Sequence, residues 1–138
     1  MVSAAGAPAL TGDERLAEAL AADGDAILGD VFARMAGSLD AEAAGDTRAV
    51  IEWQIAGGPD EAPRRFQLLV ADGACTAERG GRREADVVFT IDGVDFLRMV
   101  SGAADPGQLF MFGRLQAAGD LFLAARSRTF FPGPVDAQ

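Results

Sequence analysis

The sequence predicts an α+β fold in which helices cover one face of a mostly antiparallel, five-stranded sheet. The patterns run in the order two helices, four strands, two short helices, a strand and a final helix. The strand segments alternate apolar and polar residues, so one face of the sheet is apolar and needs a cover. The 138 residues suit one domain, which we place at 12–131, with a flexible tail at 1–11 and a C-terminal tail at 132–138.

Two helices are expected before the first strand. Thr11 and Glu14 have the spacing of a capping box, and an apolar stripe follows them. Asp25 is the candidate N-cap of a second helix that runs to Leu39, with apolar residues at spacings of three and four. The acidic, alanine-rich stretch 40–46 has no wide apolar stripe, so we expect it to be a connection.

Four strands should follow these helices. Segments 49–55, 64–70 and 86–91 alternate apolar and polar side chains. A weaker strand is expected around 75–78, after the hairpin signal Asp72-Gly73. Successive strands of this kind predict an antiparallel sheet with one apolar face.

The residues after the fourth strand predict helices that cover this face. Asp92 and Asp95 open a short helix that ends at Gly102. Asp105 is the N-cap of the next helix, because Pro106 follows it at the first helical position.

The last two elements are a strand and a helix. Segment 113–119 predicts a fifth strand, with Leu115 and Ala117 directed toward the apolar face. Asp120 should cap a final helix that extends to about Phe131.

The formal charge of −9 argues against a nucleic-acid partner, because such proteins need a basic face. Anionic membranes should repel the chain on average, so at most transient membrane contact is expected. No apolar run approaches the roughly 20 residues that span a bilayer, and no signal-peptide pattern is visible. The single Cys75 cannot form an intramolecular disulfide, which suits a cytoplasmic location.

Few side chains could carry out catalysis. The chain has no His and no Tyr, which excludes a Ser-His-Asp triad and an imidazole metal site. Asp92 and Asp95 could form a carboxylate pair, but their positions favour helix capping. Cys75 has no base to activate it, and Glu52 and Gln54 should face solvent. We therefore expect no catalytic residues, no bound metal and no cofactor.

Six short motifs occur in order along the chain. They are Asp72-Gly73, Ala85-Asp86, Ser101-Gly102, Asp105-Pro106, Gly113-Arg114-Leu115 and Gly119-Asp120. Their order and spacing resemble the sterol carrier protein 2 domain, also called the sterol-binding or non-specific lipid-transfer domain. The resemblance is good over 66–126 and looser over the first strand and helices, and we expect a bacterial, stand-alone member. It implies an α+β fold that encloses an apolar tunnel for fatty acyl chains, sterols or other lipids.

Segment 110–131 contains five phenylalanines, which either complete a core or line a cavity. The residues alone leave both possibilities open, and the resemblance favours a cavity. We expect the ligand to touch residues on the inward face of their strands or on the apolar stripe of their helices. These residues are Trp53, Phe66, Leu68, Val70, Phe89, Phe96, Val100, Leu109, Phe112, Leu115, Leu121 and Phe130. Phe130 and Phe131 are further expected to plug the tunnel mouth from a mobile final helix.

The leading functional hypothesis is a cytoplasmic protein that binds a lipid or another hydrophobic small molecule without catalysis. Its ligand would be a fatty acid, a sterol-like molecule or a polyketide or isoprenoid intermediate. The alternative is an enzyme or accessory factor of a bacterial biosynthetic pathway, which would hold an intermediate in the same pocket and have a pathway enzyme as its partner. A third possibility is an interaction domain whose cavity has collapsed.

Overall fold

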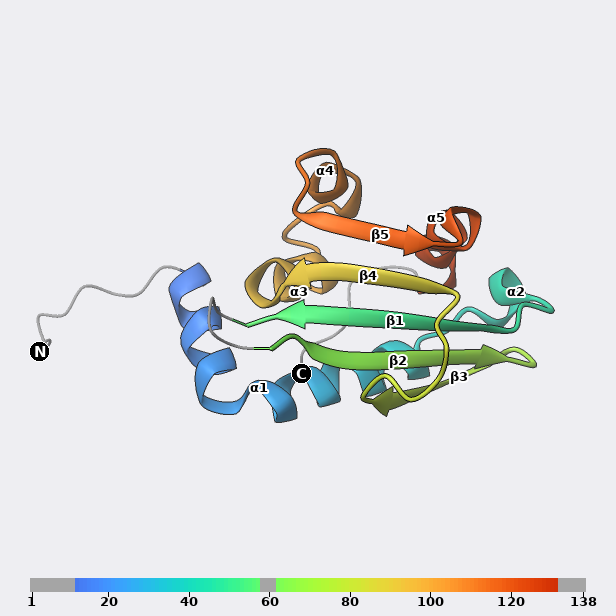
Figure 1. The fold of residues 1–138 in the computed structure, drawn as a ribbon, viewed down its shortest axis with the longest axis horizontal. Coiled ribbons are helices and arrows are strands. Elements are labelled where there is room, and N and C mark those ends of the chain that lie inside the picture. The colour runs from blue at the N-terminus through green and yellow to red at the C-terminus, as the bar shows by residue number, and fades with distance from the viewer. Residues whose placement is uncertain (1–11, 58–61, 132–138) are drawn as a thin grey trace, which may run out of the picture.

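The computed structural model describes residues 12–57 and 62–131, and they form the predicted α+β fold (Figure 1). The strands lie in the order β3-β2-β1-β4-β5, with β1 and β4 parallel and every other neighbouring pair antiparallel. Their bounds are β1 (Ala49–Ala56), β2 (Arg64–Ala71), β3 (Ala74–Arg79), β4 (Val87–Asp92) and β5 (Leu115–Gly119). The five-stranded, mostly antiparallel sheet is thus confirmed, but the first four strands are not all antiparallel as expected, because β4 lies parallel beside β1 and not next to β3. The two expected tails lie outside the described residues.

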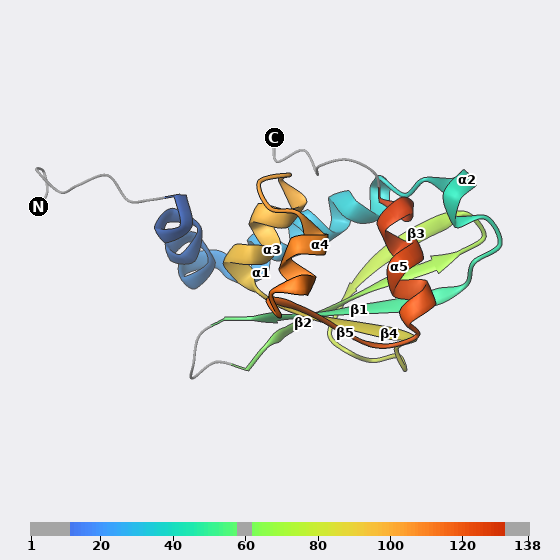
Figure 2. The same cartoon turned by 90° about the horizontal axis from the view of Figure 1, so that it is seen from above.

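The main helices cover one face of this sheet, as predicted (Figure 2). The helices are α1 (Gly12–Gly37), α2 (Ala41–Ala44), α3 (Gly93–Val100), α4 (Pro106–Met111) and α5 (Leu121–Phe130). In this view α3 and α4 lie above one end of the sheet and α5 lies above the other. The short α2 occupies the stretch that was expected to be a connection, and Asp40 caps it by accepting hydrogen bonds from two backbone N–H groups.

The two expected N-terminal helices are the two halves of α1. The backbone of Asp23 is non-helical, with φ −151° and ψ 39°, and it kinks the helix close to the predicted boundary. Asp25, however, is not the expected N-cap. Its carboxylate instead pairs with Arg64 of β2 and Arg79 of β3, at N–O distances of 2.9 and 3.0 Å. These ion pairs connect the second half of α1 to β2 and β3.

Local sequence determines how the C-terminal helices begin. Asp92, Asp105 and Asp120 cap α3, α4 and α5 as predicted, each accepting a hydrogen bond from a backbone N–H two or three residues ahead. Asp95 does not share this capping role. It lies in the first turn of α3 and its carboxylate pairs with Arg114, immediately before β5.

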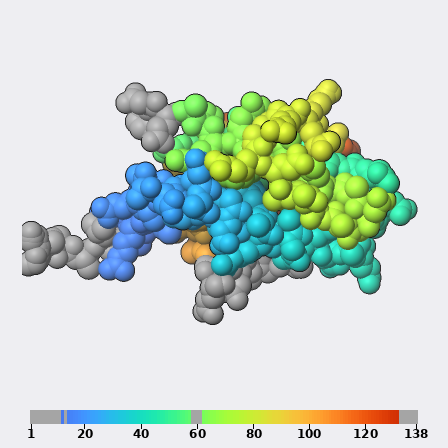
Figure 3. All heavy atoms as spheres, turned by 90° about the horizontal axis from the view of Figure 1, so that it is seen from below, coloured from blue at the N-terminus to red at the C-terminus, as the bar shows by residue number. Residues whose placement is uncertain are grey.

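The β2 half of the inner sheet face is sealed by α1. Phe32 of α1 stacks on Phe66 and on Phe96, with ring centroids 4.6 and 4.9 Å apart. Leu28 of α1 and Leu68 of β2 are also fully buried. Figure 3 shows the blue atoms of α1 packed directly against the yellow-green atoms of β3. This half of the molecule is a conventional close-packed core.

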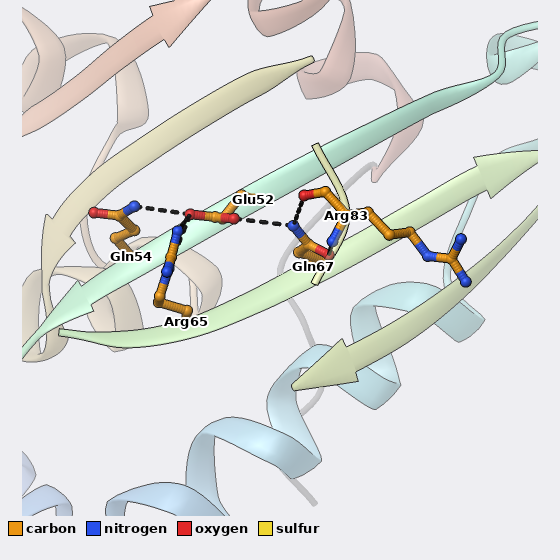
Figure 4. A network of polar contacts seen from close by, with 5 residues as sticks. All are labelled: Glu52, Gln54, Arg65, Gln67 and Arg83. Carbon is orange, nitrogen blue, oxygen red and sulfur yellow. Dashed lines mark hydrogen bonds and ion pairs between the residues drawn. The ribbon is translucent and has the colours of Figure 1, made fainter. Parts of the chain in front are cut away.

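The outer sheet face carries a buried polar cluster, where solvent-exposed residues were expected. Glu52 of β1 is only 2% exposed and Gln67 of β2 is fully buried. Glu52 accepts hydrogen bonds from Gln54, Arg65 and Gln67 at 2.7 to 3.2 Å (Figure 4). The side-chain amide of Gln67 also bonds both backbone groups of Arg83. The expectation for Glu52 was wrong because the connection that contains Arg83 crosses this face and shields the carboxylate.

Candidate functional site

An apolar cavity of about 750 Å³ lies between the other half of the sheet and the C-terminal helices. Its floor consists of inward-facing side chains of β1, β4 and β5, namely Ile51, Trp53, Phe89, Leu115 and Ala117. The walls come from α3, α4 and α5 and from the end of α1. Their larger side chains are Met35, Met99, Val100, Phe110, Leu121 and Phe131.

The cavity exists because small residues face the large side chains of the floor. The α3–α4 connection contributes Gly102 and Ala104 to the lining, and α5 contributes Ala124 and Ala125. These side chains are too short to reach the rings of the floor. Helix α1 packs mainly on β3, α3 and β2 and contributes Met35 to the lining, so within the described ranges the C-terminal helices are left to cover this space. The sequence therefore makes a close-packed core on one half of the sheet and a cavity on the other.

The cavity opens to the surface between α4 and α5. Two residues of its lining, Phe110 and Leu121, are 56% and 59% exposed. The polar residues of the lining are Asp105, Ser127 and Arg128. The Ser127 hydroxyl donates to the Ala124 carbonyl and the Asp105 carboxylate accepts from the N–H of Gln108, so both are already used within the helices.

Arg128 and Trp53 are the polar groups of the lining that have spare hydrogen-bonding capacity. Arg128 is exposed and forms no ion pair with any residue in the part of the chain that the structure describes. Trp53 stacks on Phe89, with ring centroids 4.5 Å apart. Its Nε1–H is buried and has no acceptor among the described residues. Leaving such a donor unpaired costs about 1–3 kcal/mol.

The structure brings five of the twelve predicted ligand-contact residues to the cavity. Trp53, Phe89, Val100, Leu115 and Leu121 all belong to its lining. They come from three strands and two helices, β1, β4, β5, α3 and α5. Contact between these residues and a ligand stays a prediction.

The other seven predicted residues lie outside the lining. Six are buried in the core, namely Phe66, Leu68, Val70, Phe96, Leu109 and Phe130. The three residues of β2 face α1, and Phe96 stacks on Phe32. Phe112, at the C-terminal end of α4, is instead 75% exposed. Phe130 and Phe131, which were expected to plug the tunnel mouth together, have different surroundings. Phe130 is fully buried in the core, whereas Phe131 lines the cavity.

Some lining residues were missing from the predicted set. Ile51 shares the inward face of β1 with Trp53, so strand alternation was sufficient to find it. Ala124 and Ala125 carry no comparable signal, because small side chains do not mark a cavity in a hydrophobicity pattern.

The described residues offer little for metal or thiol chemistry. They contain no group of three or more His, Cys, Asp or Glu side chains that could hold a metal ion. Burial raises the pKa of Cys75 to about 11, so its thiol is protonated at neutral pH. Cys75 lies in β3, outside the cavity lining. A separate finding is that none of the helices in the described ranges is long and apolar enough to cross a membrane.

Two known proteins are similar to this chain in sequence. Hydroxysteroid dehydrogenase-like protein 2 of Xenopus laevis is 29% identical over 99 residues, which are 72% of this chain and 23% of that protein. Peroxisomal multifunctional enzyme type 2 of Mus musculus is 30% identical over 101 residues, which are 72% of this chain and 14% of that protein. This chain therefore spans less than a quarter of either relative.

The fold is shared with a solved structure of lower identity. The solution structure of palmitated SCP2L2 from Aedes aegypti matches with a TM-score of 0.62 at 18% identity, covering 80% of this chain and 95% of that one. The family model of the SCP-2 sterol transfer family matches residues 28–132, which span the sheet, the cavity and all the helices except the first half of α1. This chain belongs to the SCP-2 sterol transfer family.

Proposed function

We propose that this chain binds one long-chain lipid in the apolar cavity and carries or presents it without catalysing a reaction. The observation that carries the proposal is the cavity itself, which has an aromatic floor and an open rim. Its volume falls within the range of about 300–1,000 Å³ that is typical of small-molecule sites. Membership of the SCP-2 sterol transfer family supports the same class of ligand.

Apolar burial alone provides enough free energy for binding. Transfer of about 14 methylene groups from water gains on the order of 11 kcal/mol, at roughly 0.8 kcal/mol each. Association and ordering of the ligand cost about 4 kcal/mol or more. The remainder corresponds to a dissociation constant in roughly the micromolar range. Because few polar contacts are needed, selectivity among acyl chains should be low.

A fatty acid is the ligand that we favour. The cationic Arg128 at the rim is suited to a carboxylate head group, and the free N–H of Trp53 is suited to a ligand oxygen. The fold is shared with a protein whose solved structure is palmitated. Sterol-like molecules and polyketide or isoprenoid intermediates are further candidates, because the rest of the lining is apolar.

Presentation of a hydrophobic substrate to an enzyme is the second candidate function. Both sequence relatives are named as enzymes, and this chain corresponds to only a small share of each. A chain of this kind would hold the substrate while a pathway enzyme supplies the catalytic residues. We propose a cytoplasmic location for either role, in keeping with the single Cys75.

Native mass spectrometry tests the proposal. The protein should retain a lipid from its expression host, or form a one-to-one complex with added palmitic acid. The recovered ligand should be chemically unchanged after prolonged incubation. A ligand whose mass changes would instead indicate catalysis by this chain. Absence of any complex with palmitic acid, cholesterol and a long-chain isoprenoid would contradict lipid binding altogether.

A further inference from the structure

The mouth of the cavity is bordered by exposed apolar side chains. We call them the rim patch, and they are Phe110 (56% exposed), Met111 (80%), Phe112 (75%), Leu121 (59%) and Phe122 (86%). They account for all the large apolar side chains that are well exposed within the described ranges. An exposed apolar surface of this kind marks an interaction site more often than chance does.

The rim patch is continuous with the cavity. It has two clusters, one at the end of α4 and one at the start of α5, which flank the edge strand β5 (Figure 1). Each cluster includes one residue of the cavity lining, Phe110 in the first and Leu121 in the second. Whatever covers the rim patch therefore also covers the entrance to the cavity.

Charge along the chain is distributed in a way that favours a membrane at this surface. Residues 93–131, which carry the whole rim patch, contain four arginines and three acidic residues, for a net charge of +1. The rest of the chain contains eight arginines and eighteen acidic residues, for a net charge of −10. Figure 1 shows α1, with six acidic residues, at the edge of the molecule opposite α4 and β5. Docking through the rim patch would turn this acidic helix away from lipid phosphates.

We propose that the rim patch docks on the surface of a lipid bilayer, so that the mouth of the cavity faces the membrane. Phenylalanine, leucine and methionine side chains would enter the boundary between head groups and acyl chains, where apolar burial drives binding. Arg128, which lines the cavity and has no ion-pair partner among the described residues, would face the lipid phosphates. This proposal rests on the proposed function, because an acyl chain could then enter the cavity without crossing water.

Two tryptophan variants report the docking directly. Phe122→Trp places an indole in the rim patch, and Thr76→Trp places one at an exposed position of β3. Trp53 is present in both variants as a common background. With phosphatidylcholine vesicles, the emission of F122W should shift to shorter wavelength and be quenched by brominated lipid. T76W should show only the response of the common Trp53, which lines the cavity and can contact bound lipid, and equal responses of the two variants would overturn the proposal.

A double variant separates docking from ligand binding. Phe112→Ser with Phe122→Ser removes two large side chains of the rim patch that do not line the cavity. Flotation with phosphatidylcholine vesicles should fall by about tenfold or more, whereas the affinity for a fluorescent fatty acid without vesicles should stay within about twofold, since the cavity is unaltered.

If the native protein binds the fatty acid but does not float with vesicles, the docking proposal fails and the proposed function stands. If it binds no fatty acid, the proposed function fails. A dimer in sedimentation analysis that the double variant disperses, without vesicle binding, would assign the rim patch to a second copy and overturn membrane docking.

Discussion

The carboxylate of Asp95 accepts two hydrogen bonds from the guanidinium of Arg114, with both N–O distances 2.8 Å. The Asp95 side chain is 3% exposed and that of Arg114 is 58% exposed. Asp95 belongs to α3 and Arg114 immediately precedes β5, and both elements contribute to the cavity lining. This pair therefore holds one wall of the cavity against its floor.

Removal of Arg114 should destabilise the protein, because it leaves the buried Asp95 carboxylate without its partner. We expect Arg114→Ala to lower the free energy of unfolding by about 1–3 kcal/mol in urea denaturation. Arg48→Ala is the matched control, because Arg48 pairs with Asp72 and both side chains are at least 70% exposed. That exposed pair should contribute about 1 kcal/mol or less. Equal losses for the two variants would contradict a structural role for the Asp95 pair.

Acid should weaken the cluster around Glu52. Burial by itself would raise the pKa of Glu52, but hydrogen bonds from Gln54, Gln67 and Arg65, together with the charge of Arg65, hold it below its ordinary value of 4.5. The stability that ionised Glu52 contributes is therefore present above pH 4.5 and is lost as the pH falls through the lower folded-state pKa.

Glu52→Gln tests this pH dependence. The variant should lower the free energy of unfolding by about 1–3 kcal/mol at pH 7, and its difference from the native protein should shrink below pH 4.5. Glu42→Gln, at an exposed position of α2, should change little at either pH. A difference for E52Q that stays constant into acid would show that the charge of Glu52 is irrelevant to folding.

The adjacent residues Phe130 and Phe131 should differ in their contributions. Phe130 is fully buried, whereas Phe131 is half-buried and lines the cavity. We expect Phe130→Ala to cost about 3–5 kcal/mol of stability. Phe131→Ala should cost about half of that or less, and should speed the release of a fluorescent fatty acid measured by stopped flow. If both variants are equally stable and release ligand equally fast, the division between core and cavity wall is wrong.

Asp120 should act as a helix cap and not as a ligand-binding acid. Its carboxylate accepts a hydrogen bond from the N–H of Leu123 at 3.0 Å, at the start of α5. Asp120→Ala should therefore lower stability by about 1 kcal/mol and leave fatty-acid affinity nearly unchanged. Unaltered urea denaturation combined with lost binding would assign Asp120 to the ligand.

The caps of the C-terminal helices follow from local sequence, whereas the predicted N-cap Asp25 was wrong because its carboxylate pairs with Arg64 and Arg79 of the sheet. Asp92, Asp105 and Asp120 were identified as helix caps because a cap and its partner lie within three residues of each other. The strand alternation also predicts which side chains of β1 and β4 face the core, including Trp53 and Phe89.

The features that depend on distant contacts were not predictable in this way. Glu52 looked exposed because the connection that covers it, around Arg83, comes some thirty residues later in the chain. Phe66 faces inward as expected, but alternation could not show that α1 seals that half of the sheet. The cavity depends on where helices fail to fill space, and alanines such as Ala124 leave no pattern that reports it.

The most direct test of lipid binding in the cavity is an equilibrium titration with a fluorescent 16-carbon fatty acid. Three proteins should be compared, namely the native chain, Ala117→Trp and Ala118→Trp. Ala117 lines the cavity, whereas its neighbour Ala118 is exposed on the opposite face of the same strand. We predict saturable one-to-one binding by the native chain and A118W, in roughly the micromolar range, and a loss of about tenfold or more in A117W because its indole fills the cavity. Equal binding by all three proteins, or no saturable binding by the native chain, would contradict the account.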